Sequence, residues 1–404
     1  MIIGIDASRA NLHHRTGTEW YSFYLIKNLA AIDHTNTYRL YVQDEPLPEL
    51  AAAVKDNPNF TFKLLNWPFY SFWTLGRLTL EMLWRRPDVL FVPAHVLPLV
   101  SPRRTVNTIH DIAFIREKNL YRSAKVKTDW QGLRPFINFF VRSITLGRYR
   151  SESLDYLYWS TAYALRHARK IIAVSNFTRQ EILDHYKDTP PEKVAVVLNG
   201  YDSGSYRPDL DPIKTQEVLA RYNLVQPYFL YVGRLEKKKN TPTLIDSFAL
   251  MRESHPELEE ARLVLVGDAG FGFDEVKYEI ELFNLNSRVN MLGWIAEEDM
   301  PYIFNGARAF VFPSRHEGFG IPVLQALGAG LPAAVSDLAV LREVAGDSVL
   351  YFNPRDKNSL ADALARVFQD EELRARLREQ GLSRVQSFSW EKCARETLNV
   401  LENL

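Results

Sequence analysis

The sequence predicts an α/β protein with two doubly wound domains, each built on a parallel sheet, that face each other across a cleft. Short apolar strands alternate with amphipathic helices along the chain, which is the pattern of parallel α/β layers. A chain of 404 residues is also too long for one typical hydrophobic core. Between residues 199 and 226, Gly, Pro and Asp are scattered in a way that is typical of a linker.

In the first half of the chain we expect six strands. A helix over about residues 19–31 follows the first of them, after a loop that contains Gly17. The predicted strands are residues 2–6, 38–42, 89–92, 105–109, 170–174 and 194–197.

The second half repeats the pattern. The predicted strands are residues 228–232, 262–266, 289–292 and 309–312, and an apolar helix should open at Pro322. We therefore assign residues 1–200 to an N-terminal domain and 201–388 to a C-terminal domain. A last helix follows within residues 389–404.

Composition and charge exclude several classes of protein. The net charge is +0, so the molecule as a whole has no electrostatic basis for binding nucleic acid. Its one cysteine, Cys393, excludes an internal disulfide and favours a reducing compartment. The sequence MIIGID begins a strand rather than a signal peptide, and no apolar run approaches the ~20 residues that span a bilayer. We expect a cytoplasmic protein, with contact at the inner face of the plasma membrane left open.

The most informative segment is PSRHEGFGIPVLQALGAGLP, residues 313–332. An apolar strand, a glycine turn and a helix N-terminus together form an anion site, because free backbone N–H groups and the helix dipole favour negative charge. The backbone of Gly318, Phe319 and Gly320 would line this site, and Glu317 at its edge can reach the hydroxyls of a ligand. The alternative is an ordinary turn between strand and helix with an exposed glutamate.

This segment resembles the donor-binding signature of the retaining glycosyltransferases of family 4, which have the GT-B architecture. In that family a Glu and a second Glu are separated by seven residues, and Gly-Phe-Gly follows the first. Glu317 fills the first position, while the second is Gln325, a departure. The resemblance implies that Glu317 faces the donor sugar, that residues 318–321, including Ile321, line the donor, and that Gln325 meets the ribose without a charge.

A second motif, YVGRLEKKKN at residues 231–240, places four cations shortly after a predicted strand. A solvated charge run at a helix start would be the ordinary interpretation. However, cations are disfavoured at a helix N-terminus unless an anion joins them. The motif is similar to the family element whose Arg and Lys hold the donor diphosphate, so the resemblance assigns that role to Arg234 and Lys239.

Three further residues match the family at single positions. His110 closes the strand TVNTI and would contact the donor sugar; the alternative is a histidine satisfied by its neighbour Asp111. Gly17 lies in the loop whose backbone approaches the donor in the family, although Thr16 or Thr18 capping the helix would also account for that loop. Trp294, in LGWI, would lie near the nucleobase. The matches run in the expected order along the chain, and the final helix would cross back to the N-terminal domain.

One segment departs from most relatives. Residues 116–170 carry 12 Lys and Arg against 4 Asp and Glu, a net charge of +8, interleaved with aromatic residues. This pattern suits an anionic membrane surface or a lipid-phosphate acceptor. A helical lobe with packed aromatics and solvated cations is an equally weighted alternative.

The resemblance implies a retaining, metal-independent glycosyltransferase without a cofactor. It would move a hexose, mannose-like or glucose-like, from a UDP- or GDP-linked sugar to a glycan or lipid-linked acceptor. His110 and Glu317 would be its catalytic residues. The sole Asp-x-Asp string, at residues 209–211, lies in the predicted linker and does not suggest a metal site. A sugar-nucleotide epimerase of the same architecture and a non-catalytic nucleotide-sugar-binding protein are the alternatives.

Overall fold

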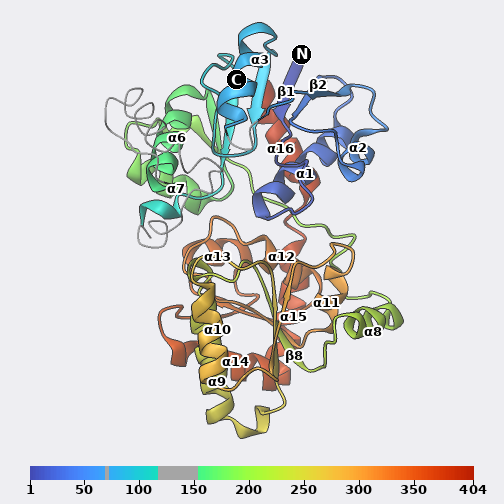
Figure 1. The fold of residues 1–404 in the computed structure, drawn as a ribbon, viewed down its shortest axis with the longest axis vertical. Coiled ribbons are helices and arrows are strands. Elements are labelled where there is room, and N and C mark those ends of the chain that lie inside the picture. The colour runs from blue at the N-terminus through green and yellow to red at the C-terminus, as the bar shows by residue number, and fades with distance from the viewer. Residues whose placement is uncertain (69–71, 117–152) are drawn as a thin grey trace. The chain divides into compact units, whose positions relative to one another are not determined.

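The computed structural model describes residues 1–68, 72–116 and 153–404, and the chain divides into two compact units (Figure 1). Unit 1 comprises Met1–Gly200 together with Trp390–Leu404, and unit 2 comprises Tyr201–Ser389. Within the described residues, no helix is both long and apolar enough to span a membrane.

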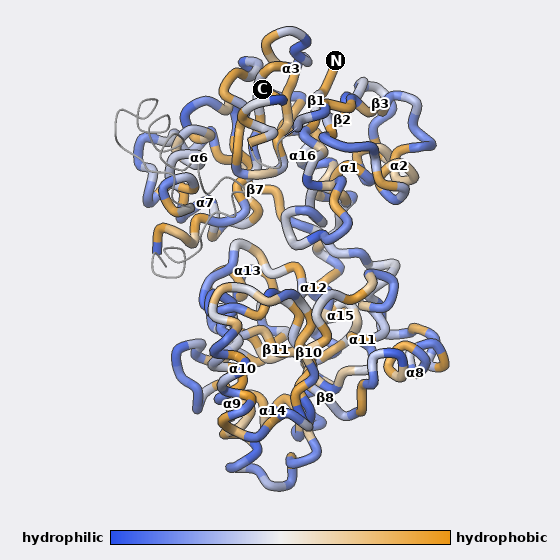
Figure 2. Tube along the Cα trace, viewed as in Figure 1, coloured by the Kyte–Doolittle hydropathy of each residue, from blue (hydrophilic) through white to orange (hydrophobic). Residues whose placement is uncertain are grey.

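The sheet of unit 1 is wholly parallel among the described residues, with strand order β3-β2-β1-β4-β5-β6-β7. Residues on both faces of its central strands are buried, and none of them is charged: β4 reads VLFV and β5 reads TVNTI. Figure 2 shows the start of the chain, which leads into β1, in the orange of hydrophobic residues. The strands are β1 Ile2–Asp6, β2 Thr37–Val42, β3 Phe60–Leu64, β4 Val89–Val92, β5 Thr105–Ile109, β6 Lys170–Ala173 and β7 Val194–Val196.

Local signals set the helices of unit 1. Helix α1, Gly17–Ile32, begins with a capping box in which Thr16 and Glu19 satisfy each other's backbone N–H groups. The C-terminal helix α16, Trp390–Glu402, packs against α1, and the ring of Trp390 stacks on Tyr24 at 5.3 Å. The other helices are α2 Pro48–Val54, α3 Thr79–Trp84, α6 Ser153–His167 and α7 Asn176–His185, with a π-helical turn at Thr74–Leu78 before α3.

Unit 2 contains a second parallel sheet, with strand order β10-β9-β8-β11-β12-β13 in the described chain. The order reverses between β8 and β11, and in open α/β sheets ligands bind beyond the carboxyl ends of the strands at such a point. The strands are β8 Tyr228–Val232, β9 Arg262–Val266, β10 Val289–Gly293, β11 Ala309–Phe312, β12 Ala333–Ser336 and β13 Leu350–Phe352.

Apolar residues at helical spacing bury the helices of unit 2 against this sheet. On α14, Leu360, Leu364 and Val367 recur every three or four residues, and they join one buried cluster with Phe229 and Val311 of the strands. The helices are α8 Pro212–Arg221, α9 Thr241–Ser254, α10 Phe273–Leu282, α11 Met300–Gly306, α12 Ile321–Gly328, α13 Ala339–Ala345, α14 Lys357–Gln369 and α15 Glu371–Val385.

The predicted α/β class with two parallel sheets is confirmed, and so are all ten predicted strands, within a residue at each end. The prediction of a linker over residues 199–226 is wrong in part, because it contains α8. The side chain of Asp211 accepts a hydrogen bond from the N–H of Ile213, and Pro212 occupies the first turn. Asp211 is thus a helix cap.

Three strands, β3, β12 and β13, were not predicted. β12 reads AAVS and β13 reads LYF, so both are too short to show a period of two. β3 is an edge strand, and its exposed residues dilute the apolar signal. Parallel pairing with a neighbour already in the sheet, rather than local composition, makes these segments strands.

Candidate functional site

Two loops meet at the carboxyl edge of the sheet in unit 2. One follows β8 and contains the short helical turn Lys237–Lys239, and the other follows β11 and contains Glu317. β8 and β11 are hydrogen-bonded neighbours at the point where the strand order reverses. The topology therefore brings together two motifs that lie 78 residues apart in the sequence.

Lys239 and Glu317 form an ion pair at this edge. The Nζ of Lys239 lies 2.5 Å from Oε1 of Glu317, and the two side chains are only 20% and 11% exposed. The ammonium group also lies 5.8 Å from the centre of the Phe312 ring. A partly buried charge pair attracts more strongly than an exposed one, because solvent screens it less. The fold thus brings these two predicted residues into direct contact.

Asn240 fixes the position of Lys239. Its backbone is left-handed, with φ of 61°, and its side chain is buried. Its amide donates to the carbonyl of Pro354 at 2.9 Å, and its Oδ1 accepts from Nε of Arg315 at 2.9 Å. Asparagine tolerates this left-handed backbone better than most residues. Through the two hydrogen bonds, its side chain connects the loops after β8, β11 and β13. No separate role was predicted for Asn240, which ends the motif at residues 231–240; an Asn directly after a run of lysines is the signal that marks it.

The glycine turn leads into α12 as predicted, with the helix beginning at Ile321, one residue before Pro322. Gly320 has φ of 100°, and an added Cβ would lie 2.8 Å from a methyl group of Leu341, so glycine is required there. Phe319 is buried, and its ring packs edge-on against Phe388 at 6.0 Å. Phe319 can therefore offer a ligand its backbone, while its side chain anchors the turn.

The other predicted side chains of unit 2 lie in the loop after β8, on α12 and after β10. The side chain of Arg234 is 57% exposed, with Nε 3.7 Å from Oε2 of Glu236. Gln325 lies on α12 and is half-buried. Trp294 follows β10, the edge strand, which is separated from β8 by β9, and it is 36% exposed. Lys239 thus pairs with Glu317, whereas Arg234 lies near Glu236.

His110 lies at the carboxyl edge of the sheet in unit 1, directly after β5. Its Nε2 donates to the carbonyl of Pro93 at 2.9 Å, and its ring meets Tyr21 edge-on at 4.8 Å. The partner of Nε2 is thus Pro93, and not Asp111, which the alternative interpretation of His110 named. Burial, reinforced by the nearby charge of His95, lowers the pKa of His110 to about 4.

This environment fixes the tautomer of His110. A carbonyl oxygen only accepts, so Nε2 carries the proton, and in the neutral ring Nδ1 is the accepting nitrogen. At neutral pH the side chain is then a hydrogen-bond acceptor suited to a sugar hydroxyl.

Gly17 is the first residue of α1, and Thr16 caps the helix, as the alternative interpretation of this loop expected. Gly17 is exposed, and an added Cβ would have no heavy atom of the described chain within 4 Å. Packing of the protein therefore does not account for a glycine here.

Family models match both units. The model described as Glycosyltransferase Family 4 matches residues 15–204, and the model described as Glycosyl transferases group 1 matches residues 220–384. The chain belongs to the family 4, group 1 glycosyltransferases. The motifs around Lys239 and Glu317 both lie within the second match.

Among curated relatives, the O-antigen chain mannosyltransferase B of Escherichia coli is 32% identical over 258 residues, which is 63% of this chain and 65% of that protein. Mannosylfructose-phosphate synthase of Agrobacterium fabrum is 30% identical over 219 residues, 52% of this chain and 47% of its own length. The matched region thus spans less than two thirds of either relative.

Solved structures extend the likeness of fold to the whole chain. HepE from Anabaena, solved with UDP and glucose, superposes with a TM-score of 0.70 at 17% identity and covers 100% of this chain and 99% of its own. WaaG, a glycosyltransferase involved in lipopolysaccharide biosynthesis, gives 0.71 at 14% identity, with 99% of each chain covered. The fold is the GT-B architecture.

Proposed function

We propose that this protein transfers a hexose from a nucleotide-diphosphate sugar, UDP- or GDP-linked, to a glycan or lipid-linked acceptor. The observation that carries the proposal is the Lys239–Glu317 pair, which lies beside the N-terminus of α12 where the strand order reverses. A cation and a helix N-terminus suit a diphosphate, and a carboxylate beside them suits sugar hydroxyls.

Such a transfer needs a stabilised leaving diphosphate. In this proposal, Lys239, Arg234 and the N-terminus of α12 supply positive potential where negative charge develops, which is electrostatic preorganisation. The reaction then requires no metal ion. Glu317 and the neutral His110 orient the sugar, residues 318–321 and Gln325 contact the donor, and Trp294 lies near the base.

We further propose that the configuration at the sugar carbon is retained. The leaving phosphate would assist deprotonation of the acceptor on the same face of the sugar, because spacing in the sequence identifies no pair of carboxylates for double displacement. A mannose-like donor is favoured, since the names of both curated relatives above refer to a mannosyl group.

A donor screen in EDTA tests the function. Purified protein is incubated with UDP- and GDP-linked hexoses, with and without lipid-linked and glycan acceptors, and release of nucleoside diphosphate is measured. We expect release from one donor that depends on an acceptor and is unchanged by EDTA. Turnover of the sugar nucleotide to an isomer without an acceptor would instead establish the epimerase, and binding without turnover would establish the non-catalytic protein.

We also propose contact with an anionic membrane surface, where a lipid-linked acceptor would be met. The basic, aromatic segment predicted for this role runs from residue 116 to 170, but residues 117–152 lie outside the described part of the chain. A described surface supports the proposal. On α3, Leu80, Leu83 and Trp84 lie on one helical face and are 47%, 47% and 83% exposed, and Arg85 and Arg86 follow.

Vesicle flotation tests this contact. We expect the protein to float with phosphatidylglycerol vesicles, and the double change Leu83→Ser and Trp84→Ser to weaken this about tenfold, because apolar burial and Arg–lipid attraction act together. Ile213→Ser, which removes an apolar side chain that is 71% exposed in unit 2, is the matched control. Equal flotation of parent and double variant would contradict a role for α3, and no flotation of the parent would contradict the membrane contact altogether.

A further inference from the structure

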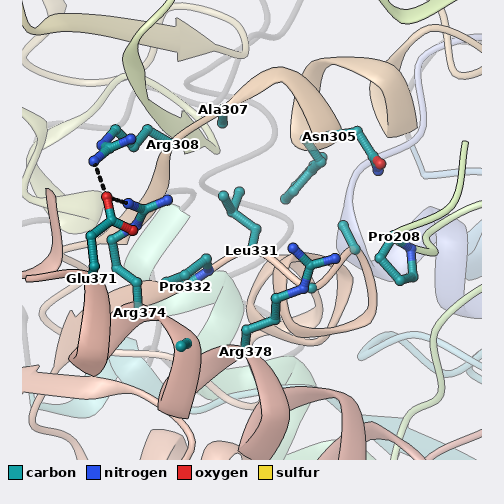
Figure 3. Close-up of a pocket in the computed structure, with 13 residues that line it drawn as sticks. Pro208, Asn305, Ala307, Arg308, Leu331, Pro332, Glu371, Arg374 and Arg378 are labelled. Carbon is teal, nitrogen blue, oxygen red and sulfur yellow. Dashed lines mark hydrogen bonds and ion pairs between the residues drawn. The ribbon is translucent and has the colours of Figure 1, made fainter. Parts of the chain in front are cut away.

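A polar pocket lies at the edge of the unit 2 sheet opposite to Lys239 and Glu317, where β11 and β12 begin (Figure 3). Its volume is about 310 Å³, which is at the lower end for small-molecule sites. Arg308 precedes β11, Leu331 and Pro332 precede β12, and Arg374 and Arg378 come from α15. A strand of four residues spans roughly 13 Å, so this pocket is separate from the edge that carries Lys239.

The pocket concentrates positive charge in a protein whose net charge is +0. Its lining residues include three arginines, Arg308, Arg374 and Arg378, against one carboxylate, Glu371. Glu371 accepts from Arg308 at 2.7 Å and from Arg374 at 2.7 Å, but its side chain is 69% exposed. One solvated carboxylate therefore bridges two guanidinium groups and leaves the lining with an excess of positive charge.

Two arginines of this pocket have unused donors. The Nε of Arg374 is buried and has no hydrogen-bond partner among the described residues. Burial, and then the neighbouring charge of Arg308, lower the pKa of Arg374. A buried donor without a partner costs about 1–3 kcal/mol, which an oxygen-rich ligand would offset. Arg378 is exposed and forms no hydrogen bond or ion pair within the described part of the chain.

The backbone makes room for this arrangement. Arg374 and Arg378 are four residues apart on α15 and share a face, although like charges at this spacing destabilise a helix. Gly330 has φ of 67° in the turn between α12 and β12, and an added Cβ would lie 3.3 Å from Nε of Arg378. Arg308 is held in place, because its Nε donates to the carbonyl of Phe368 at 2.9 Å.

We propose that this pocket binds the phosphoryl group of a small phosphorylated ligand. Guanidinium groups match phosphate oxygens in planar, two-pronged hydrogen bonds, and three of them outweigh the single carboxylate. In the view of Figure 3, Leu331 and Pro332 lie between Arg374 and Arg378, and Pro208 lies on the other side of Arg378. These apolar residues beside the arginines suit the carbon skeleton of a phosphomonoester. The inference does not rest on the proposed transfer reaction.

Calorimetric titration of the full chain tests the site with three probes: inorganic phosphate, glucose 6-phosphate and glucose. We expect inorganic phosphate and glucose 6-phosphate to bind and glucose not to bind. Arg378→Gln should weaken phosphate binding about tenfold, since one charge-assisted interaction is lost, and the double change with Arg374→Gln should weaken it further. Tighter binding of glucose 6-phosphate than of phosphate would support contact between the sugar and the apolar residues Leu331, Pro332 and Pro208.

Two control variants test whether the phosphate binds in this pocket. Arg376→Gln removes an exposed arginine of the same helix that does not line the pocket, and it should leave the affinity within twofold of the parent. The loss caused by Arg378→Gln should persist when it is measured in a Lys239→Ala background, because Lys239 lies at the other edge of the sheet. Equal loss in Arg376→Gln, disappearance of the Arg378→Gln effect in the Lys239→Ala background, or no heat at roughly 10 mM probe would each overturn the proposal. Arg378 is exposed, so its replacement keeps the test independent of folding.

Discussion

Alanine in place of Lys239 is expected to slow sugar transfer by roughly 10²- to 10³-fold, about 3–4 kcal/mol of transition-state stabilisation. The ammonium group lies where the proposed leaving diphosphate gains charge, and its 20% exposed side chain is only weakly screened by solvent. Steady-state release of nucleoside diphosphate, measured for parent and variant at saturating acceptor, gives the loss directly.

Lys237→Ala is the matched control for this change. Lys237 belongs to the same helical turn, but it pairs with Glu275 of α10 rather than with Glu317. Its removal should change the rate by less than about threefold, because an exposed ion pair contributes little. Equal losses in the two variants would mean that only the general positive potential of the loop matters, and the specific role of Lys239 would be wrong.

Folding and catalysis can be separated at the same pair. Lys239→Ala leaves Glu317 partly buried without its counter-charge, so the variant should also be less stable. Adding Glu317→Gln removes that charge and should restore part of the melting temperature. The rate should stay low, since neither change replaces the missing cation. Recovery of the rate in the double variant would indicate that Lys239 acts only by neutralising Glu317.

His110→Ala is expected to lower the transfer rate by roughly 30- to 100-fold, about 2–3 kcal/mol, because a hydrogen bond aimed at the sugar is lost. The ring is held by Pro93 and Tyr21, so its accepting nitrogen is oriented before a ligand arrives. His34→Ala, a change in the same unit away from the edge where β5 ends, serves as a control. A fall in rate that is no larger in His110→Ala than in the control would contradict the assignment.

The pH dependence of His110 follows from its environment. Burial lowers its pKa to about 4 in the folded protein, against 6.5 for an ordinary histidine, so the ring stays neutral through neutral pH. Titration of His110 should therefore cause no inflection in the transfer rate near pH 6.5. Any inflection that is seen there should persist in His110→Ala. Between pH 6.5 and about 4 the unfolded chain binds a proton at this site that the folded chain does not. Lowering the pH through this window should reduce the free energy of unfolding, and less so in the variant.

The sequence predicted the α/β class, ten strands and the two motifs that carry the site, because each depends on signals a few residues long. Apolar runs mark buried parallel strands, and glycine followed by proline marks a turn into a helix. The same local signals were misread between residues 199 and 226, where Asp211 and Pro212 start a helix within a segment rich in turn residues. They were too weak in β12 and β13, which become strands only through their neighbours.

Only the tertiary structure decided which of the candidate residues meet. Lys239 and Glu317 are 78 residues apart in the sequence. Nζ of Lys239 lies 2.5 Å from Oε1 of Glu317 because β8 and β11 are adjacent in the sheet. The left-handed Asn240, which fixes that loop, and the carbonyl of Pro93, which sets the tautomer of His110, also depend on contacts between distant segments. The sequence by itself determined which chemical groups are available and on which local elements they lie. Their pairing and protonation came from burial and strand order, which no local pattern encodes.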